Sequence, residues 1–279
     1  MERIAAALGQ TPASLRPLGG GSVAEVYELV MPGGERLVAK VGSAGAKLAL
    51  EGWMLGYLAE HSAAPVPAVR HASDTLLVMD YIASSGGITP AVERHAAEVI
   101  AALHGVRGNA FGLERDTLIG GLHQPNPAFA SWLDFFRDQR LRYMAEEAAR
   151  AGRLPTALLK RIDKLAAKLG DWIGEPAYPA LIHGDLWSGN VLAHGGKLAG
   201  LIDPAIYYAD PEIELAFTTL FGTFGDAFFG RYCELRPLQP RFFEERRDLY
   251  NLYPLLVHVR LFGGSYVASV DRTLAQFGC

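Results

Sequence analysis

The stretch His183–Asn190, which reads HGDLWSGN, carries the most information about fold and chemistry. Asp185 and Asn190 are five residues apart, and Asp203 follows thirteen residues after Asn190. Short apolar segments at 181–183, 191–193 and 198–202 are typical of β-strands, so each acidic residue follows a predicted strand. Phosphoryl transfer from a nucleotide needs a carboxylate that accepts the proton of the attacking hydroxyl, and an amide and a second carboxylate that hold magnesium. The spacing predicts Asp185 as the catalytic base and Asn190 and Asp203 as Mg2+ ligands.

The N-terminal part of the sequence supplies features that suit a nucleotide. Lys40 ends the apolar segment Leu37–Lys40, and Glu51 follows eleven residues later on a predicted helix. A buried lysine is costly without a partner, so we expect an ion pair between the two side chains, with the lysine directed at phosphates. Missing side chains also let backbone N–H groups approach phosphate oxygens, as expected for the loop formed by Gly19, Gly20, Gly21 and Ser22.

The periodicity of the chain changes near residue 83. Before it, strands are predicted at 23–30, 36–41, 66–71 and 75–82, and one helix at 47–61. After it, helices are predicted at 89–105, at 126–152, from 155, and from 211 with breaks at 237–240 and 263–264. We therefore expect an N-terminal nucleotide-binding lobe over 1–83 and a C-terminal catalytic and substrate-binding lobe over 84–279.

Composition excludes several classes of function. The 279 residues carry a formal net charge of −4 and no Lys/Arg-rich run, so nucleic acid is not an expected partner. No apolar run is long enough to span a bilayer, so no membrane association is expected. The two cysteines form neither a disulfide framework nor a thiolate metal site, which favours a cytoplasmic location. The Walker A, dinucleotide-binding and zinc-protease motifs are missing, so the nucleotide site must be of the kinase type.

The motifs resemble those of the fructosamine kinase (ketosamine-3-kinase) family over nearly the whole chain. The segment HGD alone is shared with aminoglycoside phosphotransferases and choline kinases. The continuation Trp187–Asn190 and the segments IGG at 119–121 and HQPNP at 123–127 narrow the resemblance, together with 247–253 and 261–264. The resemblance implies a two-lobed, protein-kinase-like α+β fold, with a small mostly-β N-lobe that has one helix and a larger mostly-α C-lobe.

The resemblance also implies an activity. ATP, with Mg2+, would phosphorylate the sugar 3-hydroxyl of ketosamines, either small molecules or glycated lysines on proteins, which is a deglycation repair step. Lys40 would contact the phosphates with Glu51 as its partner. The backbone of a hinge between the lobes would read adenine, with the residues Met79, Asp80, Tyr81 and Ile82.

The sequence does not decide where the acceptor binds or which class of protein this is. We expect the acceptor to contact Trp187, Gln124 and Asn126, although Trp187 could equally pack the catalytic loop. The alternatives are an aminoglycoside- or choline-type phosphotransferase and a nucleotide-binding pseudokinase. A pseudokinase usually lacks the base, a metal ligand or the lysine, and this chain has all three. The acidic residues at 210, 212 and 214 could attract a cationic amine or form a solvated helix N-terminus.

Overall fold

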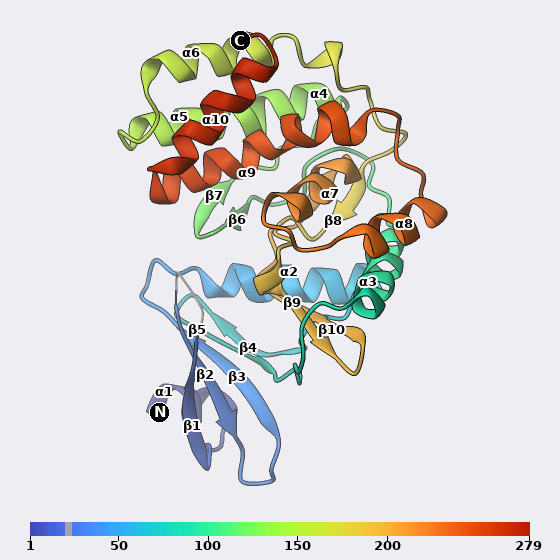
Figure 1. Ribbon diagram of the computed structural model, residues 1–279. Helices are drawn as coiled ribbons and strands as arrows, with labels where there is room; N and C mark the ends of the chain where they lie inside the picture. The colour runs from blue at the N-terminus through green and yellow to red at the C-terminus, as the bar shows by residue number, and fades with distance from the viewer. Residues whose placement is uncertain (20–23) are drawn as a thin grey trace.

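The computed structural model describes residues 1–19 and 24–279. Its N-terminal part is an antiparallel sheet of five strands, preceded by helix α1 (Glu2–Leu8) (Figure 1). The strand order is β1-β2-β3-β5-β4, with β1 at Ser14–Leu18, β2 at Glu25–Val30, β3 at Arg36–Val41, β4 at Val69–Ser73 and β5 at Leu76–Asp80. Strands β2 and β3 confirm the predicted hairpin. Strand β4 begins three residues later than predicted. Residues 20–22 of the predicted glycine loop lie outside the described residues.

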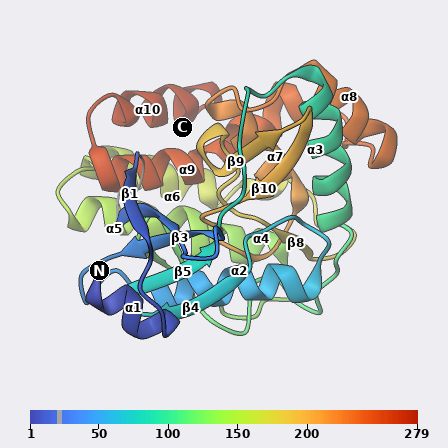
Figure 2. The ribbon, with the colours of Figure 1, turned by 90° about the horizontal axis from the view of Figure 1, so that it is seen from below.

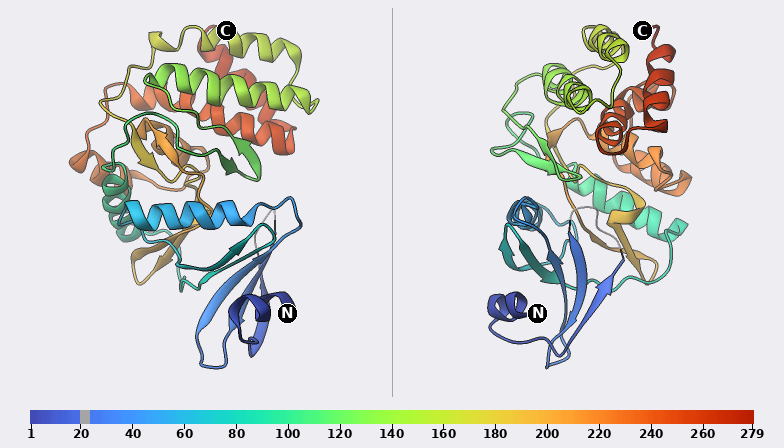
Figure 3. Two further views of the ribbon diagram at one scale, coloured as in Figure 1. Left: turned by 180° about the vertical axis from the view of Figure 1, so that it is seen from behind. Right: turned by 90° about the vertical axis from the view of Figure 1, so that its left-hand side faces the viewer.

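Helix α2 (Leu48–His61) lies between this sheet and the rest of the molecule (Figure 3). One side of the helix packs against the sheet through Leu48 and Leu55, while Met54 and Leu58 belong to the core of the C-terminal part. Gly52 allows the close approach to the sheet, because a Cβ atom there would lie only 2.8 Å from the Cβ atom of Ala72. The N-terminal part therefore shares one helix between two hydrophobic cores.

The C-terminal part is mostly helical and carries three short hairpins or strand pairs. Helix α3 (Pro90–Leu103) begins with Thr89, whose side chain accepts a hydrogen bond from the Val92 amide, as predicted for a helix N-cap. The paired strands are β6 (Thr117–Ile119) with β7 (Leu122–Gln124), β8 (Ala180–Ile182) with β11 (Tyr207–Ala209), and β9 (Val191–His194) with β10 (Lys197–Leu201). The other helices of more than three residues are α4 (Trp132–Phe135), a π-helix (Phe136–Arg142), α5 (Tyr143–Arg150), α6 (Thr156–Ala166), α7 (Pro211–Leu220), α8 (Asp226–Leu235), a second π-helix (Phe242–Arg246), α9 (Arg247–Phe262) and α10 (Ser265–Gln276). Two short 3-10 helices lie at Leu169–Asp171 and Ser188–Asn190.

Helix α3 packs along α8 and beside the β9–β10 hairpin, which lies next to the end of the N-terminal sheet (Figure 2). The connection between the two parts runs along this hairpin, since the Ser85 amide donates to the Ala193 carbonyl oxygen at 2.8 Å. Within residues 1–19 and 24–279, every helix falls short of the length and apolar character that a membrane span requires.

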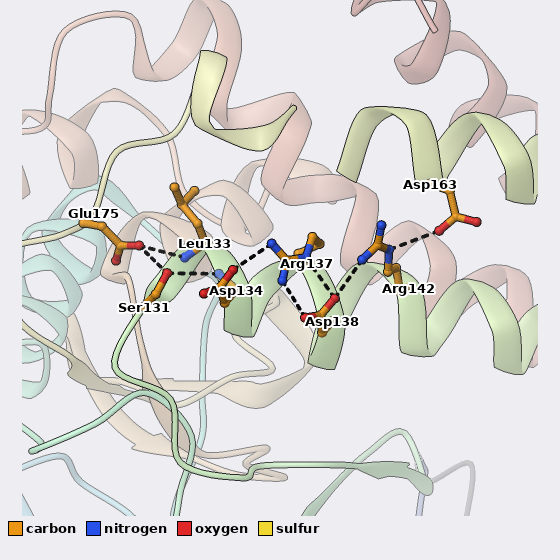
Figure 4. A network of polar contacts seen from close by, with 8 residues as sticks. All are labelled: Ser131, Leu133, Asp134, Arg137, Asp138, Arg142, Asp163 and Glu175. Carbon is orange, nitrogen blue, oxygen red and sulfur yellow. Dashed lines mark hydrogen bonds and ion pairs between the residues drawn. The ribbon is translucent and has the colours of Figure 1, made fainter. Parts of the chain in front are cut away.

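The predicted helix start at Asn126 is wrong, because α4 begins only at Trp132. Ser131 is the N-cap, and its side chain accepts from the Asp134 amide at 3.2 Å. The Glu175 carboxylate accepts from the Ser131 hydroxyl at 2.6 Å and from the Leu133 amide at 3.3 Å, as Figure 4 shows. A distant glutamate thus satisfies the free N–H groups of the first turn, which local sequence signals do not reveal.

Candidate active site

The loop after β8 brings together two of the predicted site residues. Gly184 follows the strand with φ of +84°, and a Cβ atom there would clash with the carbonyl oxygen of Ala205, so the position requires glycine. The Asn190 side-chain amide donates to the Asp185 backbone oxygen at 2.8 Å and to its Oδ2 at 3.0 Å. The amide therefore fixes both the loop and the orientation of the Asp185 carboxyl.

The Asp185 carboxyl lies in an environment that disfavours its charge. Burial raises its pKa to about 7, against the lowering effect of the hydrogen bond from Asn190. The carboxylates of Asp203 and Glu214 add to the rise. A carboxyl with a pKa close to neutral is suited to accept a proton from a hydroxyl and to release it again.

The predicted ion pair between Lys40 and Glu51 is present, with 2.6 Å between Nζ and Oε1. The same ammonium group also pairs with the Asp203 carboxylate, which reaches it from the loop after β10. Burial alone would lower the pKa of Lys40, but the charges of Glu51 and Asp203 outweigh it and raise the pKa above its usual value. Lys40 is therefore a permanent cation between the sheet, helix α2 and the C-terminal part.

The backbone at Asp203 is unusual. Its φ of +54° lies in the left-handed region, which a non-glycine residue occupies at a cost of order 1 kcal/mol or more. In this conformation the Asp203 carboxylate pairs with Lys40. Asp203 and Asp185 both line the same cavity.

The donor set of Asn190 and Asp203 fits a hard divalent cation. In the described part of the chain, the Asn190 side-chain oxygen accepts no hydrogen bond from protein, and the Asp203 carboxylate is partly exposed. Magnesium prefers oxygen ligands and is commonly held by one or two protein groups together with phosphate oxygens and water. No cluster of three His, Cys, Asp or Glu side chains suited to a metal occurs in residues 1–19 and 24–279.

Glu214, on α7, is a site residue whose role the sequence did not reveal. Its carboxylate accepts from the Gly184 amide at 2.7 Å and contacts His104 Nε2 at 2.9 Å, while the other nitrogen of His104 contacts the Tyr232 hydroxyl at 2.7 Å. Burial alone would raise the pKa of Glu214, but these partners lower it. A buried chain of polar groups thus anchors the loop that carries Asp185.

The two other acidic residues at the start of α7 are also buried, so a solvated helix N-terminus is a wrong description of this segment. The Asp210 side chain accepts from the Glu212 amide at 2.9 Å and from the Tyr250 hydroxyl at 2.7 Å. Glu212 pairs with Arg246 at 2.6 Å. Neither carboxylate lines the cavity, so neither is placed to receive a cationic amine.

Gln124 and Asn126 lie beneath the cavity and not on its wall, which corrects their prediction as acceptor contacts. Gln124 is completely buried, donates to Thr117 and to the Ala205 carbonyl oxygen, and accepts from the Tyr253 hydroxyl at 2.6 Å. Asn126 is bound in the same way by Arg140 at 2.6 Å and donates to Thr117 at 2.8 Å. Their amides satisfy buried groups, as buried amides must, and none is free for a ligand.

Lys40, Asp185 and Asp203 line one cavity of about 760 Å³, which extends from Lys40 and Asp203 past Asp185 to α9 and α10. Trp187 lines it with an indole that is 40 % exposed and packs over Gly189. The segment predicted to read adenine, Met79–Ile82, is not part of the described lining. Ile82 instead packs against Gly200 of β10, where the two parts of the chain meet.

Comparison with known proteins shows which family the chain matches. The chain matches the fructosamine kinase family over residues 2–277. A protein named as a probable ketoamine kinase from Synechocystis sp. is 44% identical over 181 residues, which cover 63% of this chain and 59% of that protein. A probable ketoamine kinase from Vibrio parahaemolyticus is 31% identical over 92% of this chain and 90% of its own length. A chloroplastic protein-ribulosamine 3-kinase from Oryza sativa subsp. japonica is 33% identical over 73% of this chain and 59% of its own length.

Solved structures agree with this assignment. The crystal structure of a candidate fructosamine-3-kinase from Thermobifida fusca superposes with a TM-score of 0.88 at 30% identity, covering 99% of this chain and 98% of the other. An aminoglycoside phosphotransferase in complex with ADP and hygromycin B superposes with a TM-score of 0.71 at 17% identity, covering 98% of this chain and 97% of the other, which shows a shared fold. The two-lobed, kinase-like α+β fold is therefore confirmed, and the chain belongs to the fructosamine kinase family of small-molecule kinases.

Proposed function

We propose that the chain transfers the γ-phosphoryl group of ATP to the sugar 3-hydroxyl of a ketosamine. The observation that carries the proposal is that one cavity joins the Asp185–Asn190 pair to the cluster of Lys40, Glu51 and Asp203. Membership of a kinase family implies ATP as the phosphate donor. The names of relatives, ketoamine kinase and protein-ribulosamine 3-kinase, support a ketosamine as the acceptor.

The side chains divide the work between them. Asp185 accepts the proton of the attacking hydroxyl, and Asn190 holds its carboxyl in place. Lys40, kept in position by Glu51, contacts the phosphates of ATP once its bond to Asp203 is exchanged. Glu214 anchors the backbone next to Asp185 and so keeps the base aligned with the hydroxyl.

Asn190 and Asp203 would hold Mg2+. When bound, the ion neutralises charge that develops on the transferred phosphoryl group. Gly19, Gly20, Gly21 and Ser22 would approach the phosphates. The backbone of Met79, Asp80, Tyr81 and Ile82, which lies outside the described lining of the cavity, would contact the adenine at the junction between the lobes, which we place near residue 83. Free Cys233 and Cys279 support a cytoplasmic location. In this setting, the reaction would remove sugar adducts from amines or from lysines of glycated proteins.

ATP consumption by the purified chain tests the proposal. We expect turnover with fructosyl- or ribulosyl-lysine, and no turnover with kanamycin or choline. Phosphate at the 3-position of the product, located by NMR, distinguishes the proposed hydroxyl from its neighbours. Turnover of kanamycin or choline with none on any ketosamine would contradict the proposal. Tight ATP binding without turnover of any acceptor would favour the pseudokinase alternative.

A further inference from the structure

The end of the cavity opposite Lys40 is built from aromatic side chains of three helices. We name it the aromatic wall and define it as Phe217, Phe221, His258, Phe262 and Tyr266. The ring of His258 lies at the centre, with centroid distances of 5.0 Å to Phe221, 5.7 Å to Phe262 and 4.8 Å to Tyr266. Of the helices that carry these rings, α9 packs against both α7 and α10 (Figure 1).

Large aromatic side chains that remain exposed in the folded chain do not contribute their burial to its stability. In the described residues, four Phe, Trp or Tyr side chains are exposed, and three of them line this single cavity. Phe262 is 61 % exposed and Phe221 is 38 % exposed, and the third is Trp187. Exposed aromatic side chains that gather in one hollow are typical of a binding surface.

Helix α7 connects the wall to the catalytic end. Glu214 binds the amide next to Asp185, Phe217 follows on the same helix about one turn later, and Phe221 is the residue just after the end of this helix. An acceptor whose hydroxyl reaches Asp185 would therefore extend along α7 toward the wall. The wall lies on the acceptor side of the site, because Lys40 and Asp203 occupy the other end of the cavity.

The two ends of the cavity differ in charge. The charged side chains of the described lining all belong to the catalytic end, namely Lys40, Glu51, Asp185, Asp203 and Glu214. The described lining at the aromatic wall contains no Lys or Arg that could pair with a carboxylate and no Asp or Glu that could hold several cations. Arg153 lies outside this lining, and its guanidinium donates to the backbone oxygens of Arg260 and Leu261. Its rings offer apolar area and π-faces, which suit an apolar group or a single ammonium.

A ketosamine has two chemically different parts, a sugar with the reacting hydroxyl and the substituent of the amine nitrogen. We propose that the aromatic wall binds the substituent of the amine and selects ketosamines of apolar amines over those with a carboxylate beside the nitrogen. This inference rests on the proposed function. The sugar then occupies the polar end near Asp185, and a carboxylate next to the nitrogen would be desolvated against the rings without a cationic partner.

Three adducts of one sugar, chosen as the better of fructose and ribulose, test the proposal. They carry 2-phenylethylamine, ethylamine and phenylalanine, so that the first differs from the second by a phenyl ring and from the third by a carboxylate. We expect kcat/KM for the phenylethylamine adduct to exceed that of each of the others by about tenfold, mostly through KM. Phe262→Ala and Phe221→Ala should each reduce the advantage over ethylamine by about three- to tenfold while kcat is retained.

Phe243→Ala is the matched control, because Phe243 is 41 % exposed and lies outside the cavity. It should leave all three ratios unchanged, and thermal unfolding should show that the variants are folded. Equal kcat/KM for the three adducts, or ratios that Phe262→Ala and Phe221→Ala leave unchanged, would overturn the assignment of the wall while the proposed function stands. Self-association that Phe262→Ala abolishes would assign the wall to a second copy of the chain. Absence of turnover with all adducts would overturn the proposed function and the assignment with it.

Discussion

At the scale of single residues, the Asp185 carboxyl is held by Asn190, shielded by burial and open to the cavity. We expect Asp185→Asn to lower kcat by roughly two to four orders of magnitude, because the hydroxyl loses its proton acceptor. ATP binding and the unfolding midpoint should stay close to those of the parent, because the replacement has nearly the same shape. Turnover measurements with calorimetry on ATP check this. A variant with near-normal turnover would remove Asp185 from the mechanism.

Lys40 and Asp203 pair with each other but serve different partners in the proposed reaction. Asp203→Ala should weaken ATP binding in the presence of magnesium, since one of two protein ligands is lost, and should not weaken binding without magnesium, since Lys40 is then free of its pair with Asp203. Lys40→Ala should lower activity and keep the magnesium requirement, since it removes a phosphate contact. Calorimetry with ATP, with and without magnesium, separates the two. Unchanged Mg-ATP binding by Asp203→Ala would show that the ligand assignment is wrong.

The buried carboxyl of Asp210 should make the free energy of unfolding depend on pH. Burial, helped by the charge of Glu212, raises its pKa from 3.8 to about 7. The folded chain therefore keeps this proton where the unfolded chain has lost it, so the stabilisation is complete below pH 4 and is lost as pH rises to about 7. Asp210→Asn keeps an acceptor for the Glu212 amide and removes the titration.

Relative to the parent, the unfolding free energy of Asp210→Asn should accordingly rise with pH between about 4 and 7, by up to about 1.4 kcal/mol per pH unit. Urea denaturation at several pH values measures it. The control is Asp226→Asn, at an exposed carboxyl in the first turn of α8. A parent and variant whose stabilities run parallel over this range would contradict the expectation.

The spacing of motifs predicts which side chains come together in the site when a buried charged group requires a partner of opposite charge nearby in the chain. Lys40 and Glu51 are an example, because a strand and the following helix face bring them together. The bond from the Gly184 amide to Glu214 could not be predicted, since it depends on how α7 packs against β8. The one available signal was an acidic residue between the apolar residues Ile213 and Leu215 of the helix predicted from residue 211.

At the scale of elements, the sequence predicted the ends of helices where a capping residue or a helix breaker lies at the end itself. It missed the start of a helix whose first N–H groups bond to a residue far away in the chain. Thr89 and Gly152 mark helix ends within the sequence itself, the latter with φ of +70° just after α5. The start of α4 depends on Glu175, more than forty residues away. The three-residue strands β6, β7 and β11 are too short to show a period, and their pairing is a tertiary property.

Gln124 makes the β6–β7 hairpin part of the floor of the site. Gln124→Ala would leave the Tyr253 hydroxyl and the Ala205 carbonyl oxygen without their partner, at about 1–3 kcal/mol for each buried group. We expect a loss of unfolding free energy of several kcal/mol, measured in urea, with activity lowered only in proportion to the loss of folded protein and with KM unchanged. Gln10→Ala, at an exposed glutamine, is the control. A stable variant with a specific rise in KM would restore Gln124 as an acceptor contact.

At the scale of the whole molecule, helix α2 couples the sheet to the helical part through Leu55 on one side and Leu58 on the other. We expect one unfolding transition, with far-UV circular dichroism and tryptophan fluorescence coincident in urea. Leu58→Ala should shift both signals together and cost about 2–5 kcal/mol. Leu235→Ala, at an exposed leucine that ends α8, should shift neither. Two separate transitions would show that the parts unfold independently.

The shared helix also limits how the chain can be recombined with its relatives. A chimera that joins the sheet of one protein to the helical part of another inherits an α2 matched to only one of its two neighbours. The mismatch would fall on Met54, Tyr57 and Leu58, and on the contact of Arg115 with the Trp53 ring at 4.6 Å. A chimera that folds has to keep these positions and their partners from the same protein. The smallest module that can be exchanged is therefore the sheet, helix α2 and the residues of the C-terminal part that pack against α2.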